Sequence, residues 1–285
     1  YYMDEITISK IKEIILTELK SFNYDILGVV DKNKNVYPMT SDTKVLSKIF
    51  EMVAIPHFKK IVIKLSTKEN KCKVLLAKHQ NQYPDLTLTG GMLGDNKIAI
   101  DIKSAYRIDD KKFSGFTLGA FNGYFKDRKS TKNILFPYEN YSNHWILCFI
   151  YDRDLDTDIT EFHNIENIEE IPIIINDVEV ILQDKWKTAT TRPGSGNTAN
   201  IGGINNLQNL KDGKGDFTDS GLEVFDDYWM HYIRKEDCNK MKLPKQPFTN
   251  LTAYREWIKN GRVGDKEIET YYNVHKIDIP SESDK

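Results

Sequence analysis

Strict alternation of apolar and polar residues marks one stretch of the chain. Residues 98–103 read Ile-Ala-Ile-Asp-Ile-Lys, and successive side chains of a β-strand point to opposite faces of its sheet. We therefore predict a strand whose isoleucines face the core, with Asp101 and Lys103 emerging side by side on the other face at the strand's end. An apolar run at residues 86–88 precedes it, and the Gly-rich residues 89–96 predict a hairpin loop between the two.

The same kind of periodicity predicts the elements in the rest of the chain. Apolar residues recur at helical spacing in four segments, residues 4–21, 41–54, 223–234 and 249–260. Cap residues strengthen two of these helices, with Ser41-Asp42 before the second and Thr249-Asn250 before the fourth. Apolar runs predict strands at residues 116–120, 144–153 and 178–182, and a hairpin at residues 26–37.

The composition is that of a large globular chain. Its 285 residues are 40% hydrophobic and 29% charged, which is enough for one large domain with a substantial core. No apolar run approaches the length of a membrane span and there is no secretory signal, so we expect a cytoplasmic protein with no membrane partner. Three widely spaced cysteines form neither a metal motif nor a disulfide framework, which suits a reducing compartment.

The net charge of −2 is unevenly distributed. Residues 265–285 hold six acids and three lysines, so this tail carries −3 and residues 1–264 carry +1. The total charge therefore does not argue for or against a nucleic-acid partner, and a local basic surface is the feature to look for.

Three charged residues on the predicted hairpin suit phosphate chemistry. The first strand can bring Asp85 next to Asp101 and Lys103 on the second. Magnesium prefers oxygen ligands and binds through one or two carboxylates plus substrate phosphate. A lysine beside it can orient or help deprotonate the attacking water, or stabilise charge at phosphorus. The alternative is an edge strand that ends in solvated charges.

Other polar segments have a functional and a plain interpretation. On helix 41–54, Glu51 could supply a third carboxylate and Lys44 could point toward phosphate, or both could belong to a solvated face. Residues 79–82 are rich in amides, which read base edges or the minor groove, yet a polar loop is equally consistent. The basic residues 126–132 could contact phosphates. The Gly-rich residues 190–206 lack the Gly-Lys-Ser/Thr of a P-loop, and either approach a ligand closely or form a flexible surface loop.

Seven motifs in one order carry a resemblance to a known family. They are residues 41–51, Tyr83-Pro84-Asp85, residues 97–103, Phe116-Thr-Leu-Gly119, residues 182–186, Gly194-Ser-Gly-Asn-Thr198 and Asn200-Ile-Gly202. Together they cover roughly residues 10–262. On these motifs the chain resembles the EcoRV family of type II restriction endonucleases, within the PD-(D/E)XK nuclease superfamily. The resemblance implies the restriction-endonuclease-like fold, of class α/β (α+β), with a central mixed β-sheet flanked by helices, working as a homodimer around double-stranded DNA.

The resemblance also implies roles for individual residues. Asp85 and Asp101 match the metal-binding aspartates, Lys103 matches the catalytic lysine, and Glu51 matches an auxiliary acid that serves both the catalytic and the metal site. The residues expected to contact DNA are Lys44, His79, Gln80, Asn81, Ser104, Lys132, Gly194, Ser195, Gly196, Asn197, Thr198, Asn200 and Arg234. Residues 79–81 fall on the family's minor-groove loop, and residues 194–198 fall on its major-groove recognition loop.

The chain departs from the family pattern at several expected DNA contacts. Ser104-Ala105 replaces two threonines, Gly123 replaces a serine, Lys235-Glu236 replaces a Thr-Ser pair, and His79 replaces a glutamine. These departures affect the expected phosphate and groove contacts and leave the catalytic set intact. The tail after Arg262 has no counterpart.

The function expected from these observations is magnesium-dependent, site-specific cleavage of duplex DNA. The resemblance implies the palindrome GATATC and a blunt central cut that leaves 5′-phosphates, with Mn²⁺ able to replace Mg²⁺ and with Ca²⁺ supporting binding without cleavage. Two alternatives are a less specific repair or recombination nuclease of the same superfamily and a DNA-binding protein that does not cut. A DNA methyltransferase would be the functional counterpart in a bacterial cytoplasm.

We expect one endonuclease domain followed by a tail. The domain covers residues 1–262, with a dimerisation hairpin at about 22–40, a catalytic and recognition core at 41–203, and a C-terminal helical, DNA-contacting part at 204–262. The charged tail covers residues 263–285.

Overall fold

The computed structural model describes residues 3–155, 161–194 and 199–274. The α-helices in these ranges are α1 Glu5–Lys20, α2 Thr43–Leu65, α3 Leu207–Asp212, α4 Leu222–His231, α5 Lys235–Lys240, α6 Leu251–Lys259 and α7 Asp265–Val274. The strands are β1 Gly28–Val30, β2 Asn35–Pro38, β3 Lys73–Leu76, β4 Leu86–Thr89, β5 Lys97–Tyr106, β6 Thr117–Ala120, β7 Asn143–Arg153, β8 His163–Asn164, β9 Ile175–Asp184, β10 Ala189–Pro193 and β11 Asn200–Gly203. Short 3₁₀ helices are η1 Gly91–Leu93, η2 Gly123–Phe125, η3 Tyr138–Asn140, η4 Ile165–Glu170 and η5 Lys185–Thr188.

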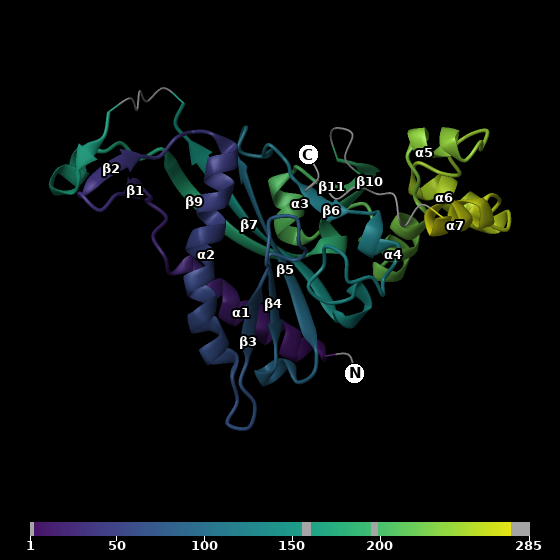
Figure 1. Cartoon of the computed structure of the whole chain (residues 1–285), viewed down its shortest axis with the longest axis horizontal. Helices are drawn as coiled ribbons and strands as arrows, with labels where there is room; N and C mark the ends of the chain where they lie inside the picture. The colour runs from purple at the N-terminus through teal and green to yellow at the C-terminus, as the bar shows by residue number, and fades with distance from the viewer. Residues whose placement is uncertain (1–2, 156–160, 195–198, 275–285) are drawn as a thin grey trace.

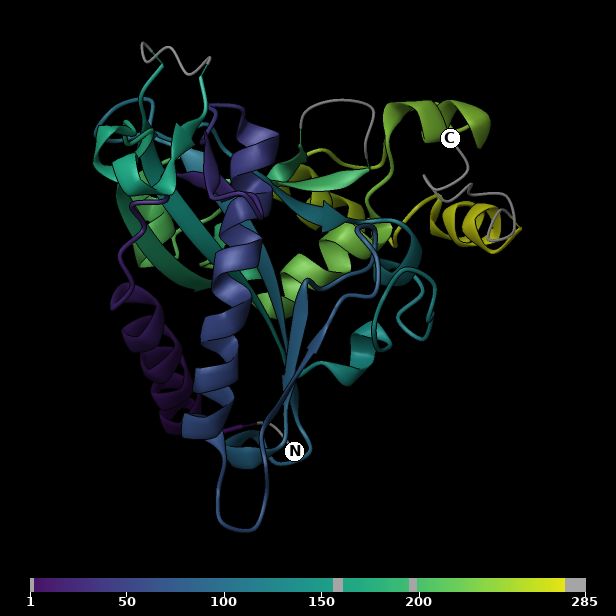
Figure 2. The same cartoon turned by 60° about the vertical axis from the view of Figure 1, so that its left-hand side comes forward.

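A five-stranded sheet in the order β3-β4-β5-β7-β9 forms the centre of the molecule (Figure 1). Its neighbouring strands are antiparallel except for β5 and β7, which run parallel. Helices α1 and α2 lie together along one face of this sheet (Figure 2). The class expected from the sequence, a central mixed sheet flanked by helices, is confirmed, and so is the predicted β4–β5 hairpin.

Strand β5 is buried on both faces. Its isoleucines pack into a core with α1 and α2, while Ala99 and Ala105 belong to a second core on the opposite face. The strand does not end at Lys103 as predicted. It continues to Tyr106, because its last three residues pair in parallel with β7. Asp101 and Lys103 therefore lie inside a central strand, where neighbouring elements restrict their access to water.

Helix α2 is longer than its sequence pattern predicted. Asp42 caps the N-terminus, as expected, but the helix runs through Pro56 to Leu65 instead of ending near Ala54. The additional turns bury an apolar stripe that includes Phe58. Burial of this stripe offsets the backbone hydrogen bond that proline removes from a helix interior.

Two three-stranded sheets lie away from the central one. The predicted hairpin at residues 26–37 is confirmed as β1 and β2, with β8 pairing on the other edge of β2. Strands β10, β11 and β6 form the second small sheet. The β1-β2-β8 sheet and the helices α4 to α7 occupy opposite ends of the long axis (Figure 1). No helix in the described ranges is long and apolar enough to cross a membrane.

The first part of the charged tail is folded. Helix α7 buries Ile268 against Ile233 and Cys238, and the ring of Tyr272 lies 4.5 Å from the Nζ of Lys126. The sequence predicted a charged tail at residues 263–285 and no helix within it.

Candidate active site

Asp85 is held against strand β5 by a hydrogen bond. It lies directly before β4, and its Oδ2 accepts the backbone N–H of Ile102 at 2.6 Å. The antiparallel register pairs Leu86 with Ile100, so the next step along the ladder sets Asp85 opposite Asp101. The register of the hairpin thus brings together two carboxylates that are far apart in the sequence.

Asp101 and Lys103 form an ion pair on one face of β5. The Lys103 Nζ lies 2.7 Å from the Asp101 Oδ2, which follows from their spacing of two residues on a strand. Asp101 is only 7% exposed. The three residues that the sequence singled out on this hairpin are therefore neighbours in the structure.

The close carboxylates change the protonation of the site. Burial, and then the charge of Asp101, raise the pKa of the Asp85 carboxyl to about 7. Glu51 adds to this rise, and Lys103 opposes it. For Lys103, burial lowers the pKa, but the charges of Asp101 and Asp85 outweigh burial and hold it above its ordinary value. Near neutral pH the site therefore holds a charged Lys103 beside an Asp85 carboxyl that is close to half protonated.

Glu51 and Lys44 lie on α2 as the sequence predicted, but Glu51 does not complete a three-carboxylate group. Its Oε2 lies 2.5 Å from the Nζ of Lys48, and it acts on Asp85 through its charge. No group of three His, Cys, Asp or Glu side chains suited to a metal occurs in the described part of the chain. Lys44 lies exposed in the first turn of α2.

The donor set fits a hard divalent cation. Asp85, directly before β4, and Asp101, on β5, offer neighbouring carboxylate oxygens, and two carboxylates with water and substrate phosphate are the usual ligands of Mg²⁺. Burial is the main cause of the raised pKa of Asp85, and repulsion from the Asp101 carboxylate adds to it. A bound cation would remove that repulsion.

The expected minor-groove residues are at the surface. His79, Gln80 and Asn81 lie exposed between β3 and β4. Gln82 closes this turn, since its Oε1 accepts the N–H of Lys78 at 2.7 Å and its N–H donates to the carbonyl of His79. The three side chains thus project from a turn that is hydrogen-bonded at its base.

The expected major-groove loop is the connection of a β-hairpin. Strands β10 and β11 pair antiparallel, and the N–H of Gly194 donates to the carbonyl of Asn200 at 2.9 Å. This bond closes the base of the loop, while Ser195, Gly196, Asn197 and Thr198 lie outside the described residues. The sequence interpretation as one long Gly-rich loop therefore misses two strands, whose pairing with each other and with β6 is a tertiary feature.

The remaining expected DNA contacts are dispersed. Ser104 follows Lys103 on β5 and is partly exposed, and Lys132 lies exposed in the basic loop. The guanidinium of Arg234 makes two hydrogen bonds to Asp237, of 2.8 and 3.1 Å. The structure brings none of these three into the Asp85–Asp101 group.

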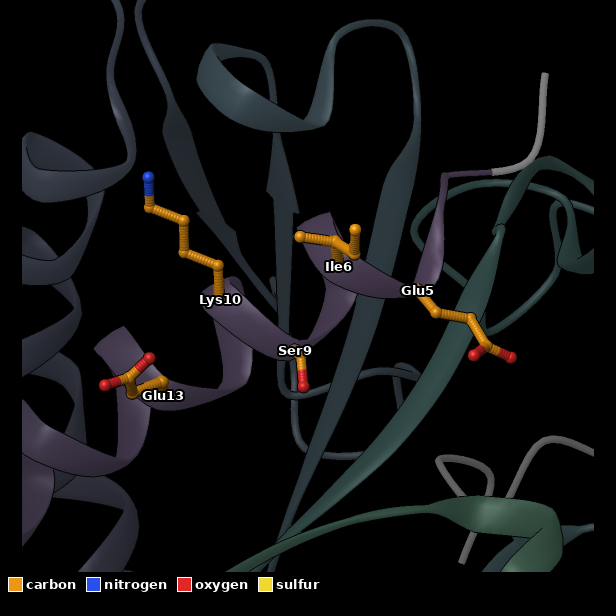
Figure 3. A pocket seen from close by; sticks show the side chains of 5 residues that line it. All are labelled: Glu5, Ile6, Ser9, Lys10 and Glu13. Atoms are coloured by element: carbon orange, nitrogen blue, oxygen red, sulfur yellow. The ribbon is translucent and has the colours of Figure 1, made fainter.

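Two surface hollows lie elsewhere. One of about 550 Å³ runs along α1 and is lined by Glu5, Ile6, Ser9, Lys10 and Glu13 (Figure 3). The other, of about 370 Å³, lies around Arg107 and Asp177. Neither includes a residue that the sequence predicted for the site.

One buried charged residue near the site escaped the sequence analysis. Lys185 stood inside a motif of the family resemblance but was assigned no role, and the structure buries it to 1% exposure. The signal available in the sequence was a lysine in the run Gln-Asp-Lys-Trp after an apolar strand. The burial of this lysine could not be predicted from the run, because it depends on the surrounding fold.

The fold and the site define a class of protein. A mixed sheet with two aspartates and a lysine on adjacent central strands is the arrangement of the PD-(D/E)XK nucleases. The family model described as restriction endonuclease EcoRV matches residues 20–259. The type II restriction enzyme EcoRV of Escherichia coli is 38% identical over 241 residues, which are 84% of this chain and 93% of that enzyme. The chain therefore belongs to the EcoRV family of restriction endonucleases, which are type II site-specific deoxyribonucleases.

Proposed function

We propose that this endonuclease hydrolyses double-stranded DNA at the palindrome GATATC in a magnesium-dependent reaction. The cut falls at the centre of the site and leaves blunt ends with 5′-phosphates and 3′-hydroxyls. The observation that carries the proposal is the grouping of Asp85, Asp101 and Lys103 on adjacent strands. The similarity to an enzyme named as a type II restriction enzyme supports it over a non-cutting DNA-binding protein.

Each residue of this group has a distinct part in the reaction. Asp85 and Asp101 would hold Mg²⁺, which supplies Lewis-acid stabilisation of charge on the phosphate when it is bound. Mn²⁺ should replace it, while Ca²⁺ should support binding only. The ion pair with Asp101 keeps the Lys103 ammonium at the site, where it orients the attacking water or stabilises charge at phosphorus. Glu51 contributes negative charge to Asp85 from α2.

Recognition is assigned to two loops. The loop closed by Gly194 and Asn200 would enter the major groove, with Asn197 offering a donor and an acceptor to an adenine edge. Residues 79–81 would face the minor groove, and Lys44, Ser104, Lys132 and Arg234 would contact the backbone. Asn197→Ala should then abolish specific cleavage while weak, salt-sensitive DNA binding survives.

The active form is proposed to be a homodimer. A palindromic site matches a two-fold axis that sets one recognition loop on each half. The β1-β2-β8 sheet exposes an apolar face, with Val29 57%, Tyr37 49% and Phe162 62% exposed. Burial of such a patch against a second copy would stabilise the dimer. We place the enzyme in a bacterial cytoplasm beside a DNA methyltransferase that protects the same site.

The domain boundaries expected from the sequence form part of this proposal. The dimerisation segment would be residues 22–40, the catalytic and recognition core residues 41–203, and the C-terminal DNA-contacting part residues 204–262.

Digestion of a sequenced plasmid tests the function directly. Incubation with Mg²⁺ should give discrete bands whose ends map to the centre of GATATC, and incubation with Ca²⁺ or EDTA should give none. A smear in place of bands would indicate a nuclease of loose specificity. Uncut plasmid in Mg²⁺ and Mn²⁺ would indicate a protein that binds without cutting.

A further inference from the structure

Lys185 is a buried lysine with no hydrogen-bond partner for its ammonium. It is the first residue of η5, directly after β9, and is 1% exposed. Its Nζ has no partner among the described residues. Burial of an unpaired ammonium is strongly unfavourable, so its surroundings must favour the charge in another way.

Aromatic rings surround this ammonium. The Nζ lies 4.7 Å from the ring centre of Tyr83, 5.6 Å from that of Phe125 and 5.8 Å from that of Tyr138, distances at which ring faces attract a cation. Gly119 also lies beside the ammonium, since a Cβ at this position would meet the Nζ at 3.9 Å, an ordinary van der Waals distance. Tyr83 is two residues before Asp85, so the aromatic cage is continuous with the catalytic hairpin.

The charges around Lys185 connect it to the active site. Burial, the largest influence, lowers its pKa to about 8, whereas the charge of Asp101 raises it. The charges of Lys103 and Arg128 also lower the pKa of Lys185, and the charge of Asp226 also raises it. At neutral pH the side chain is thus mostly protonated. Lys185 thus interacts with Asp101 through its charge, whereas Lys103 forms a direct ion pair with Asp101.

We propose that Lys185 is a positioning residue that supplies an internal positive charge to the carboxylates of the metal site. In the metal-free enzyme this charge offsets the repulsion among Asp85, Asp101 and Glu51. When a divalent cation binds, the same charge opposes it, so Lys185 sets the metal affinity from within the protein. The proposal rests on the metal site proposed above.

Calcium titration of the full-length protein tests this role without any cleavage. In Lys185→Met the charge is lost and the shape is kept, so the Kd for Ca²⁺ measured by calorimetry should fall about tenfold. Lys187→Met is the matched control, because Lys187 lies on the same 3₁₀ helix but is 38% exposed, where solvent screens its charge. Lys185→Arg should restore the wild-type affinity.

The outcomes separate the two proposals. A wild-type protein that binds no Ca²⁺ overturns the metal site and this proposal together. If the wild-type protein binds Ca²⁺ and Lys185→Met binds it with the same affinity, the role of Lys185 is overturned and the metal site stands. The role of Lys185 is also overturned if Lys185→Arg gains as much Ca²⁺ affinity as Lys185→Met. Thermal unfolding in EDTA checks that each variant is folded.

A measurement on the wild-type protein decides the matter if Lys185→Met does not fold. With ¹³C-labelled lysines at pH 8, added Ca²⁺ should move the Lys185 ε-carbon signal toward its deprotonated position, because linkage between the two cations is reciprocal. A signal that stays in place overturns the proposal. The other lysine with a strongly lowered pKa, Lys126, is identified by the signal lost in Lys126→Met.

Discussion

Asp85 and Ile102 are joined by a hydrogen bond of 2.6 Å from the backbone of β5 to the side chain that precedes β4. This bond holds the Asp85 carboxylate at Ile102, the residue between Asp101 and Lys103 on β5. A backbone donor has no rotamers, so the sheet itself restrains the position of the Asp85 carboxylate. Strand pairing thus preorganises the proposed catalytic group.

Replacing Asp101 should abolish cleavage without unfolding the protein. Asp101→Asn removes one of the two carboxylates while keeping the shape of the side chain, so cleavage in Mg²⁺ should fall by about 10³-fold or more. Supercoiled plasmid is the substrate, and nicked and linear products are both counted. Asp95→Asn, an exposed change in the turn of the same hairpin, should cut at the wild-type rate. Substantial cutting by Asp101→Asn would remove this residue from the mechanism.

The stability of the metal-free enzyme should depend on Asp85 between pH 4 and pH 7. The folded pKa of about 7 lies above the ordinary aspartate pKa of 3.8, so in this range the folded state binds more protons than the unfolded state. Stability from this group is present at low pH and is lost as the pH rises toward 7. From pH 5 to pH 7.5 in EDTA, wild type should lose about 1–2 kcal/mol of unfolding free energy relative to Asp85→Asn.

Urea unfolding at a series of pH values measures this difference, with Asp95→Asn as the control that should follow wild type. Parallel curves for wild type and Asp85→Asn would show that the two carboxylates do not interact in the folded state.

Disruption of the apolar sheet should separate the dimer. In Tyr37→Glu a charge replaces a half-exposed aromatic residue of β2, which is paired with Val29 of β1. We expect monomers in sedimentation velocity and loss of double-strand cleavage. Ile6→Glu is the control, since Ile6 is 82% exposed on α1, away from that sheet. A variant Tyr37→Glu that stays dimeric would place the interface elsewhere.

The rate of cleavage should depend on the central base step. In a two-fold dimer the centre of the site lies between the two recognition loops, so it is read through its deformability. A TA step unstacks and kinks at low cost, which would bring the central phosphates toward Asp85 and Asp101. Duplexes with AT in place of the central TA should be cut at least about tenfold more slowly than those with TA. Sequenced termini should be blunt, and staggered ends would show a different separation of the two active sites.

Local patterns in the sequence determined most of the elements of this fold. The alternation at residues 98–103 determined which side chains of β5 share a face, because side-chain direction in a strand depends on sequence parity alone. Asp42 and Asn250 marked the starts of two helices, because a cap satisfies backbone groups within three residues. For several polar residues these patterns left both a functional and a plain structural interpretation open, and the family resemblance assigned roles to those residues.

Tertiary structure decided what depends on distant residues. The register of β4 on β5 set Asp85 beside Asp101, and the parallel pairing with β7 carried β5 past Lys103 into the core. The burial of Lys185 required aromatic rings from three separate segments. Strand pairing and burial are contacts between segments far apart in the chain, and the free energy of such contacts does not appear in any local pattern. The sequence therefore determined which groups the site contains, and the fold decided their distances and their charge.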